Sequence, residues 1–376
     1  MKKRVIIGLS GGVDSSVAAY LLKQANYDVI GLFMVNWDSA ANHDVLGNPN
    51  LADDLCPQEK DYDDAKNVAD HIGIPLKRVD FIEEYWDDVF TYFLDEYKRG
   101  RTPNPDIMCN KYIKFEAFKR HAQNLDADYI AMGHYARIED SKEGPLLLRG
   151  LDANKDQSYF LSQLTQSQLK DVLFPVGHLR KQDVRKIAKE AKLPTALKKD
   201  STGICFIGER QFNEFLKNYL PAQPGDIITL EGERIAAHQG LMHYTIGQRK
   251  GLGIGGLKGY SDEAWFVVGK DLNANHLIVA QGYHHERLYA TSCTLEGVNI
   301  IPPGDIKTRD LTAKFRYRQK DHAVDLSFEN GMYHVVFKEP IRAVTPGQSC
   351  VFYDGEVCLG GGIIKDVYKN DERLMY

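Results

Sequence analysis

The feature that most constrains the fold is a glycine-rich loop near the N-terminus, which separates an apolar run from an amphipathic stretch. Val5 to Leu9 is continuously apolar, as is typical of a strand buried on both faces. After the loop, Val13, Val17 and Leu21 recur every four residues, as on one face of a helix. The turn between strand and helix therefore predicts a helix N-terminus whose unpaired backbone N–H groups would bind an anion.

The loop itself, SGGVDS from Ser10 to Ser15, favours phosphate as that anion. Gly11 and Gly12 let a phosphate approach the backbone without meeting a Cβ atom, and the serines add hydroxyl donors. A Walker A loop needs Lys followed by Ser or Thr, and the dinucleotide fingerprint needs G-x-G-x-x-G; neither is present in this loop. The residues instead resemble the pyrophosphate loop (PP-loop) of the N-type ATP pyrophosphatases, which cleave ATP between the α- and β-phosphates. An ordinary glycine-rich turn is the alternative.

The 376 residues are enough for three domains. A second apolar strand at residues 28–35 follows the first helix, and this β-α-β alternation predicts a doubly wound parallel α/β sheet within residues 1–218. Short strands and many glycines predict a small, mostly β central domain at residues 219–284. Repeated short strands with Asn-Gly, Pro-Gly and Asp-Gly turns predict an antiparallel β-barrel at residues 285–376.

Several shorter stretches carry predictions about local structure. Residues 84–98 and 160–173 predict helices, whereas residues 99–115, interrupted by two prolines, predict a polar loop that holds Cys109. Between Lys314 and Arg318 basic and aromatic residues alternate. A strand there would place three cations on one face, where they would follow a phosphate backbone. A solvated barrel face is the alternative.

Composition predicts a globular cytosolic protein. The net charge of −5 is unevenly distributed: eight acidic residues and one lysine lie between Asp38 and Asp64, whereas eight basic and two acidic residues lie between Arg180 and Lys199. The basic stretch is expected either to bind RNA or to be a solvated helix. No apolar run approaches the ~18 residues that a membrane helix needs, so no membrane partner is predicted. The charged N-terminus runs directly into the loop rather than into a signal peptide.

The six cysteines include no C-x-x-C pair, which gives no support to a zinc ribbon and little to an iron–sulfur cluster, so no metal site is predicted. Four of them are expected to be small buried hydrophobes. Cys109 and Cys205 differ, because lysines lie near both in polar stretches and nearby ammonium groups favour the reactive thiolate. For Cys109 a buried, inert thiol is the alternative.

Five further motifs occur in order along the chain: NPDxxCN, GHYAR, KDQSYFL, STGICFIG and GQRKGLG. Together with the PP-loop they resemble the bacterial tRNA-specific 2-thiouridylases over nearly the whole chain. That family installs sulfur at C2 of the wobble uridine in the tRNAs for Lys, Glu and Gln. The resemblance implies a sulfurtransferase that uses ATP and Mg²⁺ to adenylate the uridine C2 oxygen. Sulfur transfer from a persulfide would follow, giving 2-thiouridine, AMP and pyrophosphate.

The resemblance also implies site residues. The ATP-binding residues would be Gly8, Leu9, Ser10, Gly11, Gly12, Val13, Asp14, Ser15, Met34 and Gly133. Cys205 would carry the persulfide, received from a cysteine desulfurase directly or through a relay protein, with Cys109 as its partner thiol. Asp106 would act as general acid or base. The residues that contact tRNA would be Asn104, Pro105, Asp106, His134, Lys155, Asp156, Gln157, Arg316, Tyr317 and Gln348.

Three other functions remain open at this point. Another PP-loop enzyme, for tRNA lysidine, GMP or argininosuccinate synthesis, would not need two reactive cysteines. A nucleotide-regulated RNA-binding protein would bind tRNA without releasing pyrophosphate. A cluster-dependent thiolase is disfavoured, because the C-x-x-C pair is missing.

Overall fold

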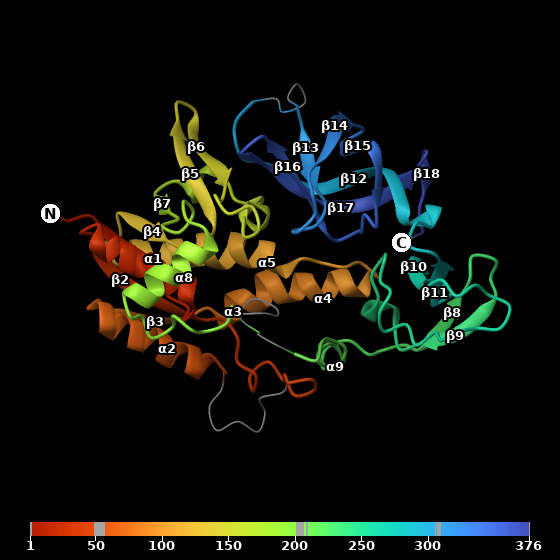
Figure 1. Ribbon diagram of the computed structural model, residues 1–376, viewed down its shortest axis with the longest axis horizontal. Helices are drawn as coiled ribbons and strands as arrows, with labels where there is room; N and C mark the ends of the chain where they lie inside the picture. Colours follow the sequence, from red (N-terminus) through yellow and green to blue (C-terminus); the bar gives the residue numbers. More distant parts are fainter. Residues whose placement is uncertain are drawn as a thin grey trace.

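The computed structural model describes residues 2–48, 57–200, 207, 210–304, 306 and 310–375, and its strands form three sheets (Figure 1). The first sheet is parallel, the second has four strands, and six strands of the third close into an antiparallel barrel. The predicted order of a doubly wound α/β domain, a small mostly β domain and a C-terminal β-barrel is confirmed.

The parallel sheet forms from the short apolar runs of the first half of the chain. Its strands, in order across the sheet, are β3 (Leu76–Asp80), β2 (Asp28–Val35), β1 (Arg4–Gly8), β4 (Tyr129–Ala131) and β7 (Val172–Leu173). Since every pairing is parallel, the carboxyl ends of β1, β2 and β4 meet at one edge, where α/β sheets bind ligands. Three helices pack near this edge: α1 (Val13–Gln24) contacts both α2 (Pro57–Ile72) and α8 (Lys181–Glu190).

Two further helical segments each contain a π-helical stretch. The helix predicted at residues 84–98 is present as α3 (Ile82–Tyr85), the π-helix η1 (Trp86–Phe90) and α4 (Thr91–Lys98). The second segment consists of α5 (Pro105–Met108), the π-helix η2 (Cys109–Ala117) and α6 (Phe118–Gln123). The loop predicted over residues 99–115 is therefore wrong from Pro105 onward. Proline suits the first helical position, where its missing N–H leaves no hydrogen bond unmade, so Cys109 lies on a helix.

The helix predicted at residues 160–173 is also wrong. The structure has the 3₁₀ turn η3 (Ser158–Leu161), the short helix α7 (Gln166–Leu169) and then β7. The Thr165 side chain accepts a hydrogen bond from the Gln168 backbone, and the Gln168 side chain accepts one in return from the Thr165 backbone. This capping box begins a new helix at residue 166 and so divides the apolar stretch.

The two C-terminal sheets contain the remaining strands. The central sheet, which follows helix α9 (Phe212–Lys217), consists of β10 (Trp265–Asp271), β11 (His276–Gln281), β8 (Gly225–Ile228) and β9 (Arg234–His238). The barrel consists of β12 (Tyr289–Ile300), β15 (Met332–Arg342), β14 (His322–Glu329), β13 (Thr312–Lys314), β16 (Ser349–Asp354) and β17 (Val357–Lys369), closed by pairing of β12 with β17. The short strand β18 (Glu372–Arg373) pairs with β17 in antiparallel orientation. Short 3₁₀ turns are η4 (Leu241–His243) and η5 (Glu286–Leu288).

The barrel sheet continues into the first half of the chain. The hairpin of β5 (Ala136–Ser141) and β6 (Gly144–Arg149) follows β4, and β6 pairs with β17 through Leu148 and Val357 (Figure 1). A segment between two motifs of the α/β domain is thus hydrogen-bonded to the barrel.

The strand predicted between Lys314 and Arg318 ends at Lys314, so the proposed row of three cations on one face is wrong. Phe315 is fully buried in the barrel core. Arg316 turns inward and donates hydrogen bonds to the carbonyls of Ile246 and Ala343, which anchors the central domain to the barrel.

One lysine is buried where the central sheet, the barrel and the chain after α4 meet. Lys270 of β10 is 4% exposed, and its Nζ donates a 2.8 Å hydrogen bond to the carbonyl of Gly100, just beyond α4. Thr345 and Pro346, between β15 and β16, line the same small cavity. Burial lowers the pKa of Lys270 to about 7.

We predict that Lys270 makes stability depend on pH. Between pH 7 and the ordinary lysine value of 10.5, the unfolded chain binds a proton at Lys270 that the folded protein does not. Stability therefore rises with pH over this range. Relative to Lys270→Met, the wild type should gain about 3.5 kcal/mol between pH 7 and pH 10. Thermal unfolding of both proteins across this range measures the difference, and a constant difference would contradict the prediction.

Candidate nucleotide site and the segments beside it

The glycine-rich loop lies between the carboxyl end of β1 and the N-terminus of α1, as the sequence predicts. Gly12 is the N-cap residue and supplies no side chain to the first-turn N–H groups. Gly11 has φ of +73°, and a Cβ atom there would lie 2.2 Å from the carbonyl oxygen of Asp61 on α2. Only glycine fits this position, and the loop leaves the helix N-terminus available to an anion.

The other residues predicted to bind ATP lie against this loop. A Cβ atom on Gly133, which follows β4, would lie 2.8 Å from the backbone nitrogen of Ser15. A Cβ atom on Gly8 would lie 3.5 Å from Cε of Met34 and 2.7 Å from Sδ of Met132. The structure therefore brings the loop, Met34 and Gly133 together at the carboxyl edge of the sheet.

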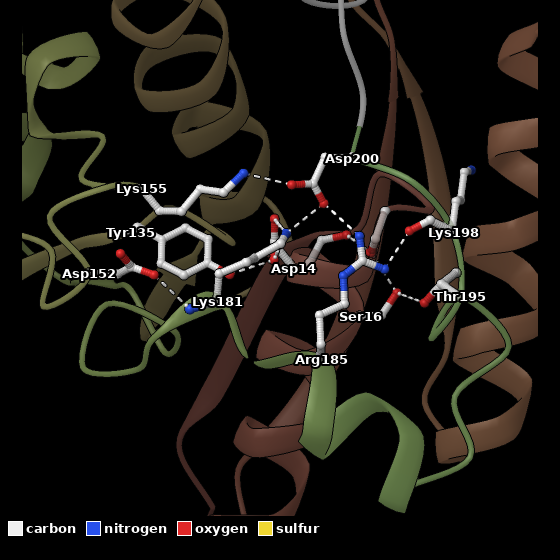
Figure 2. Close-up of polar contacts among 12 residues, drawn as sticks. Asp14, Ser16, Tyr135, Asp152, Lys155, Lys181, Arg185, Thr195, Lys198 and Asp200 are labelled. Carbon is white, nitrogen blue, oxygen red and sulfur yellow. Dashed lines mark hydrogen bonds and ion pairs between the residues drawn. The ribbon is translucent and has the colours of Figure 1, made fainter. Parts of the chain in front are cut away.

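An ion network lies on the open side of the loop (Figure 2). Lys181 Nζ, at the start of α8, donates to both carboxylate oxygens of Asp14 at 2.7 Å, and the hydroxyl of Tyr135 donates to Oδ1 of the same carboxylate at 2.7 Å. Lys181 also contacts Asp200 at 2.8 Å. Lys155 and Arg185 each pair with Asp200 at 2.7 Å, so three cations converge on one carboxylate.

The electrostatics of Asp200 follow from these contacts. Its partial burial would by itself raise the pKa of the carboxyl group, but hydrogen bonds from Lys155 and Lys181 outweigh that effect. They hold the pKa of Asp200 well below its usual range, so the carboxylate is ionised at neutral pH.

Sequence reasoning did not single out Lys181, Arg185 or Asp200. The basic composition of residues 180–199 predicts either RNA binding or a solvated helix, and neither interpretation identifies these side chains. Four residues apart on α8, Lys181 and Arg185 share one helical face toward the loop, whereas the Lys186 side chain is 73% exposed. The four-residue spacing of Lys181 and Arg185 is the sequence signal that could have placed both side chains on one face of the helix.

Cys205 lies outside the described residues, but the described residues on either side of it are anchored. Asp200 is held by the ion network on the N-terminal side. On the C-terminal side Arg210, 4% exposed at its side chain, pairs at 2.8 Å with Asp44, whose side chain is fully buried. The indole of Trp37 donates a further 3.0 Å hydrogen bond to Asp44. Both anchors are charge-assisted, which makes them stronger than neutral hydrogen bonds.

Cys109 is the first residue of η2 and is fully buried within the largest hydrophobic cluster. Its burial agrees with the alternative of a buried thiol that the sequence analysis gives for Cys109. Asn104, Pro105 and Asp106 are half-buried on the chain just before it. Gln348, from the barrel domain, donates hydrogen bonds to the carbonyls of Thr102 (2.7 Å) and Pro103 (3.3 Å) and so fixes the entrance to this helix.

The remaining residues predicted to contact tRNA make internal contacts in this structure. His134 is 8% exposed against Phe115 and Phe174, and burial lowers its pKa well below 6.5, so the ring is neutral at pH 7. Asp156 accepts 3.0 Å hydrogen bonds from the backbones of Gly150 and Ser158. Gln157 accepts one from the backbone of Tyr135, and Tyr317 packs on Phe160 with ring centroids 4.4 Å apart.

Two features are absent from the described part of the chain. None of its helices is both long and apolar enough to cross a membrane. Nor do His, Cys, Asp and Glu side chains gather there in a group of three or more that would hold a metal ion.

The parallel sheet and its glycine-rich loop define an α/β nucleotide-binding domain. The family profile described as the tRNA methyl transferase HUP domain matches residues 3–209. The profiles described as the tRNA methyl transferase PRC-barrel domain and the aminomethyltransferase beta-barrel domain match residues 213–281 and 291–364. The chain belongs to the tRNA-specific 2-thiouridylase family.

The relatives cover nearly the whole chain. The tRNA-specific 2-thiouridylase MnmA of Ligilactobacillus salivarius is 58% identical over 99% of this chain and 98% of its own. The protein of the same name from Listeria monocytogenes is 58% identical over 99% of this chain and 97% of its own. That of Acholeplasma laidlawii is 57% identical over 100% of both chains. Among solved structures, a 4-thiouridine synthetase–RNA complex with bound ATP aligns with a TM-score of 0.35 and 17% identity, over 55% of this chain and 46% of that one.

We predict that the Arg210–Asp44 pair is required for stability. Arg210→Met would leave the Asp44 carboxylate buried beside Trp37 without its main counter-charge, a loss of roughly 3–5 kcal/mol. The double variant Arg210→Met/Asp44→Leu should recover much of the loss, because it removes both charges. Thermal unfolding measures both effects; equal stability of Arg210→Met and wild type would contradict the prediction.

We also predict that Gly133→Ala weakens ATP binding at least tenfold, because the added methyl group would press on the backbone of Ser15 in the loop. Gly256→Ala, where a Cβ atom meets nothing within 4 Å, is the matched control and should bind ATP like the wild type. Isothermal titration calorimetry with ATP compares the three proteins. Unchanged affinity of Gly133→Ala would remove Gly133 from the site.

Proposed function

We propose that this protein is an ATP-dependent tRNA sulfurtransferase that makes 2-thiouridine at the wobble position of the tRNAs for Lys, Glu and Gln. The observation that carries the proposal is the link between the loop and the segment that contains Cys205. Asp200, five residues before Cys205, is joined through Lys181 to Asp14 of the loop. A nucleotide on the loop and a thiol after Asp200 would therefore act at neighbouring places. Near-identical length and 58% identity to proteins named tRNA-specific 2-thiouridylase support the same substrate.

The first step would activate the base. The C2 oxygen of uridine attacks the α-phosphate of ATP, the bond to the β-phosphate breaks, and pyrophosphate leaves. The backbone N–H groups at the start of α1 would stabilise the phosphates, with Gly8 to Ser15 around them and Met34 and Gly133 beside the adenosine. Asp106, half-buried on α5, would serve as general acid or base toward the target base.

The second step would transfer sulfur. The terminal sulfur of a Cys205 persulfide attacks C2, and AMP leaves with the former C2 oxygen. The Cys109 thiolate then attacks Sγ of Cys205, forming a Cys109–Cys205 disulfide and releasing 2-thiouridine. A cellular thiol reductant would regenerate both cysteines, and a cysteine desulfurase or relay protein would reload Cys205.

Burial of Cys109 sets a condition on this second step. The Cys109 thiol is fully buried, and a disulfide with Cys205 needs the two Cα atoms within about 7 Å of each other. We therefore propose that tRNA binding moves the helix that begins at Pro105. Gln348 of the barrel domain, which holds the carbonyls of Thr102 and Pro103, would change partners when tRNA contacts it.

Mg²⁺ would enter with the nucleotide. Both oxygens of the loop carboxylate, Asp14, accept hydrogen bonds from Lys181, so its ligand capacity is already engaged. The ion would therefore bind mainly to the ATP phosphates and water, as Mg²⁺ commonly does. Its contribution when bound is to neutralise charge on the departing pyrophosphate.

We predict that the wild type, with ATP, Mg²⁺ and a persulfide-generating desulfurase, forms 2-thiouridine in unmodified tRNA for Glu, measured by nucleoside mass spectrometry. Cys205→Ser and Cys109→Ser should each reduce product by at least a hundredfold. Cys293→Ala, which alters a cysteine buried in the barrel core, should retain activity and is the control.

The outcomes separate the remaining functions. ATP cleavage to AMP and pyrophosphate without sulfur incorporation would point to another PP-loop enzyme. Binding of tRNA without pyrophosphate release would point to an RNA-binding protein. Loss of product in Cys205→Ser alone would keep the thiouridylase and remove Cys109 from the mechanism.

A further inference from the structure

The ion network gathers three cationic side chains around one carboxylate. Lys155, Lys181 and Arg185 all contact Asp200, and of these three only Lys181 also contacts Asp14. The side chains of these three cations pair with two carboxylates, those of Asp14 and Asp200, while the Asp152 carboxylate accepts a hydrogen bond from the Lys181 backbone. The group lies beside a helix N-terminus that is itself electropositive. Three cationic side chains around one point suit a phosphate, which has more oxygens than a carboxylate to accept charge-assisted hydrogen bonds.

We propose that Lys155, Lys181 and Arg185 bind the β- and γ-phosphates of ATP, and that the Asp200 carboxylate occupies this phosphate position in the nucleotide-free protein. The proposal rests on the proposed use of ATP and names the residues that hold the pyrophosphate portion. Neither the loop motif nor the residues expected from the family resemblance to bind ATP include them.

The positions of the three cations fit this role. Lys181 and Arg185 lie on one face of α8, and Lys155 reaches the same carboxylate from the turn before η3 (Figure 2). Lys181 links this group directly to the loop through Asp14. An α-phosphate at the N-terminus of α1 would therefore have its β- and γ-phosphates beside the three side chains.

The backbone of α8 is also arranged for this task. Its first N–H, that of Lys181, donates to the Asp152 carboxylate at 2.9 Å, which caps the helix and orients its first turn. Arg185 is braced through a hydrogen bond to the carbonyl of Ala196 at 3.2 Å. Side chains whose positions are set before the nucleotide arrives lose less entropy on binding it.

The chemistry explains why cations would be placed there. When the bond between the α- and β-phosphates breaks, negative charge builds up on the departing pyrophosphate. Cations that contact the β- and γ-phosphates stabilise this charge more in the transition state than in bound ATP, and so they accelerate the first step. Before ATP binds, Asp200 neutralises part of the charge of the same cations.

A purely structural ion network would predict something different for one substitution. If Asp200 competes with phosphate, Asp200→Asn removes the competitor and should tighten binding of pyrophosphate. If Asp200 only holds the fold together, the same substitution should weaken binding or leave it unchanged. The sign of this effect distinguishes the two roles.

The experiment is isothermal titration calorimetry of the full chain with inorganic pyrophosphate, ATP and AMP, each with Mg²⁺. Lys155→Gln and Arg185→Gln should weaken binding of pyrophosphate and ATP about tenfold and change AMP binding less than twofold. Asp200→Asn should tighten pyrophosphate binding about threefold or more. Lys186→Gln, which removes an equal charge from the exposed face of α8, is the control and should match the wild type. Thermal unfolding of each variant confirms that it is folded.

The outcomes also separate this inference from the proposed function. Wild-type binding of ATP with unchanged pyrophosphate affinity in Lys155→Gln and Arg185→Gln would overturn the inference and leave the proposed function standing. Weaker pyrophosphate binding by Asp200→Asn would overturn the role of Asp200. Absence of ATP binding by the wild type would overturn both proposals.

Discussion

The contact of Lys181 with Asp14 and Asp200 is the interaction on which the candidate site depends. It joins three parts of the chain that are far apart in sequence: the glycine-rich loop, helix α8 and the residue before the segment that contains Cys205. Opposite charges at hydrogen-bond distance in a partly buried setting hold such parts together more firmly than surface ion pairs do. The position of Asp200 relative to the glycine-rich loop therefore depends on charge rather than on an apolar core.

The domains are joined by buried polar groups as well. Gln163 donates to the carbonyls of Gly297 and Gly361, and Asn299 donates in return to those of Ser162 and Leu164. Hairpin β5–β6 adds backbone pairing to the barrel. Since a buried polar group without a partner is costly, these reciprocal bonds favour one relative position of the domains. The barrel is thereby held beside the helix that carries Cys109.

Several motif residues support the fold in addition to any role toward tRNA. Arg316 anchors the central domain, Gln348 fixes the chain before Pro105, and Asp156 holds a turn through two backbone N–H groups. A ligand that contacts Gln348 would act on a residue that already bridges two domains. If tRNA contacts Gln348 as proposed, binding would be coupled to domain position through this side chain, and tRNA would act on the chain that leads to the buried Cys109.

The sequence alone determined the strand–loop–helix unit, the parallel sheet and the barrel, because these follow from local periodicity, glycine positions and turn residues. It also indicated the family through its ordered motifs. It did not determine the helix at Pro105, the capping box at Thr165 or the turn after Lys314, where local signals compete and packing decides. Only the tertiary structure assembled Lys155, Lys181, Arg185 and Asp200, because their convergence depends on how α8 packs on α1, a long-range contact that no local pattern encodes.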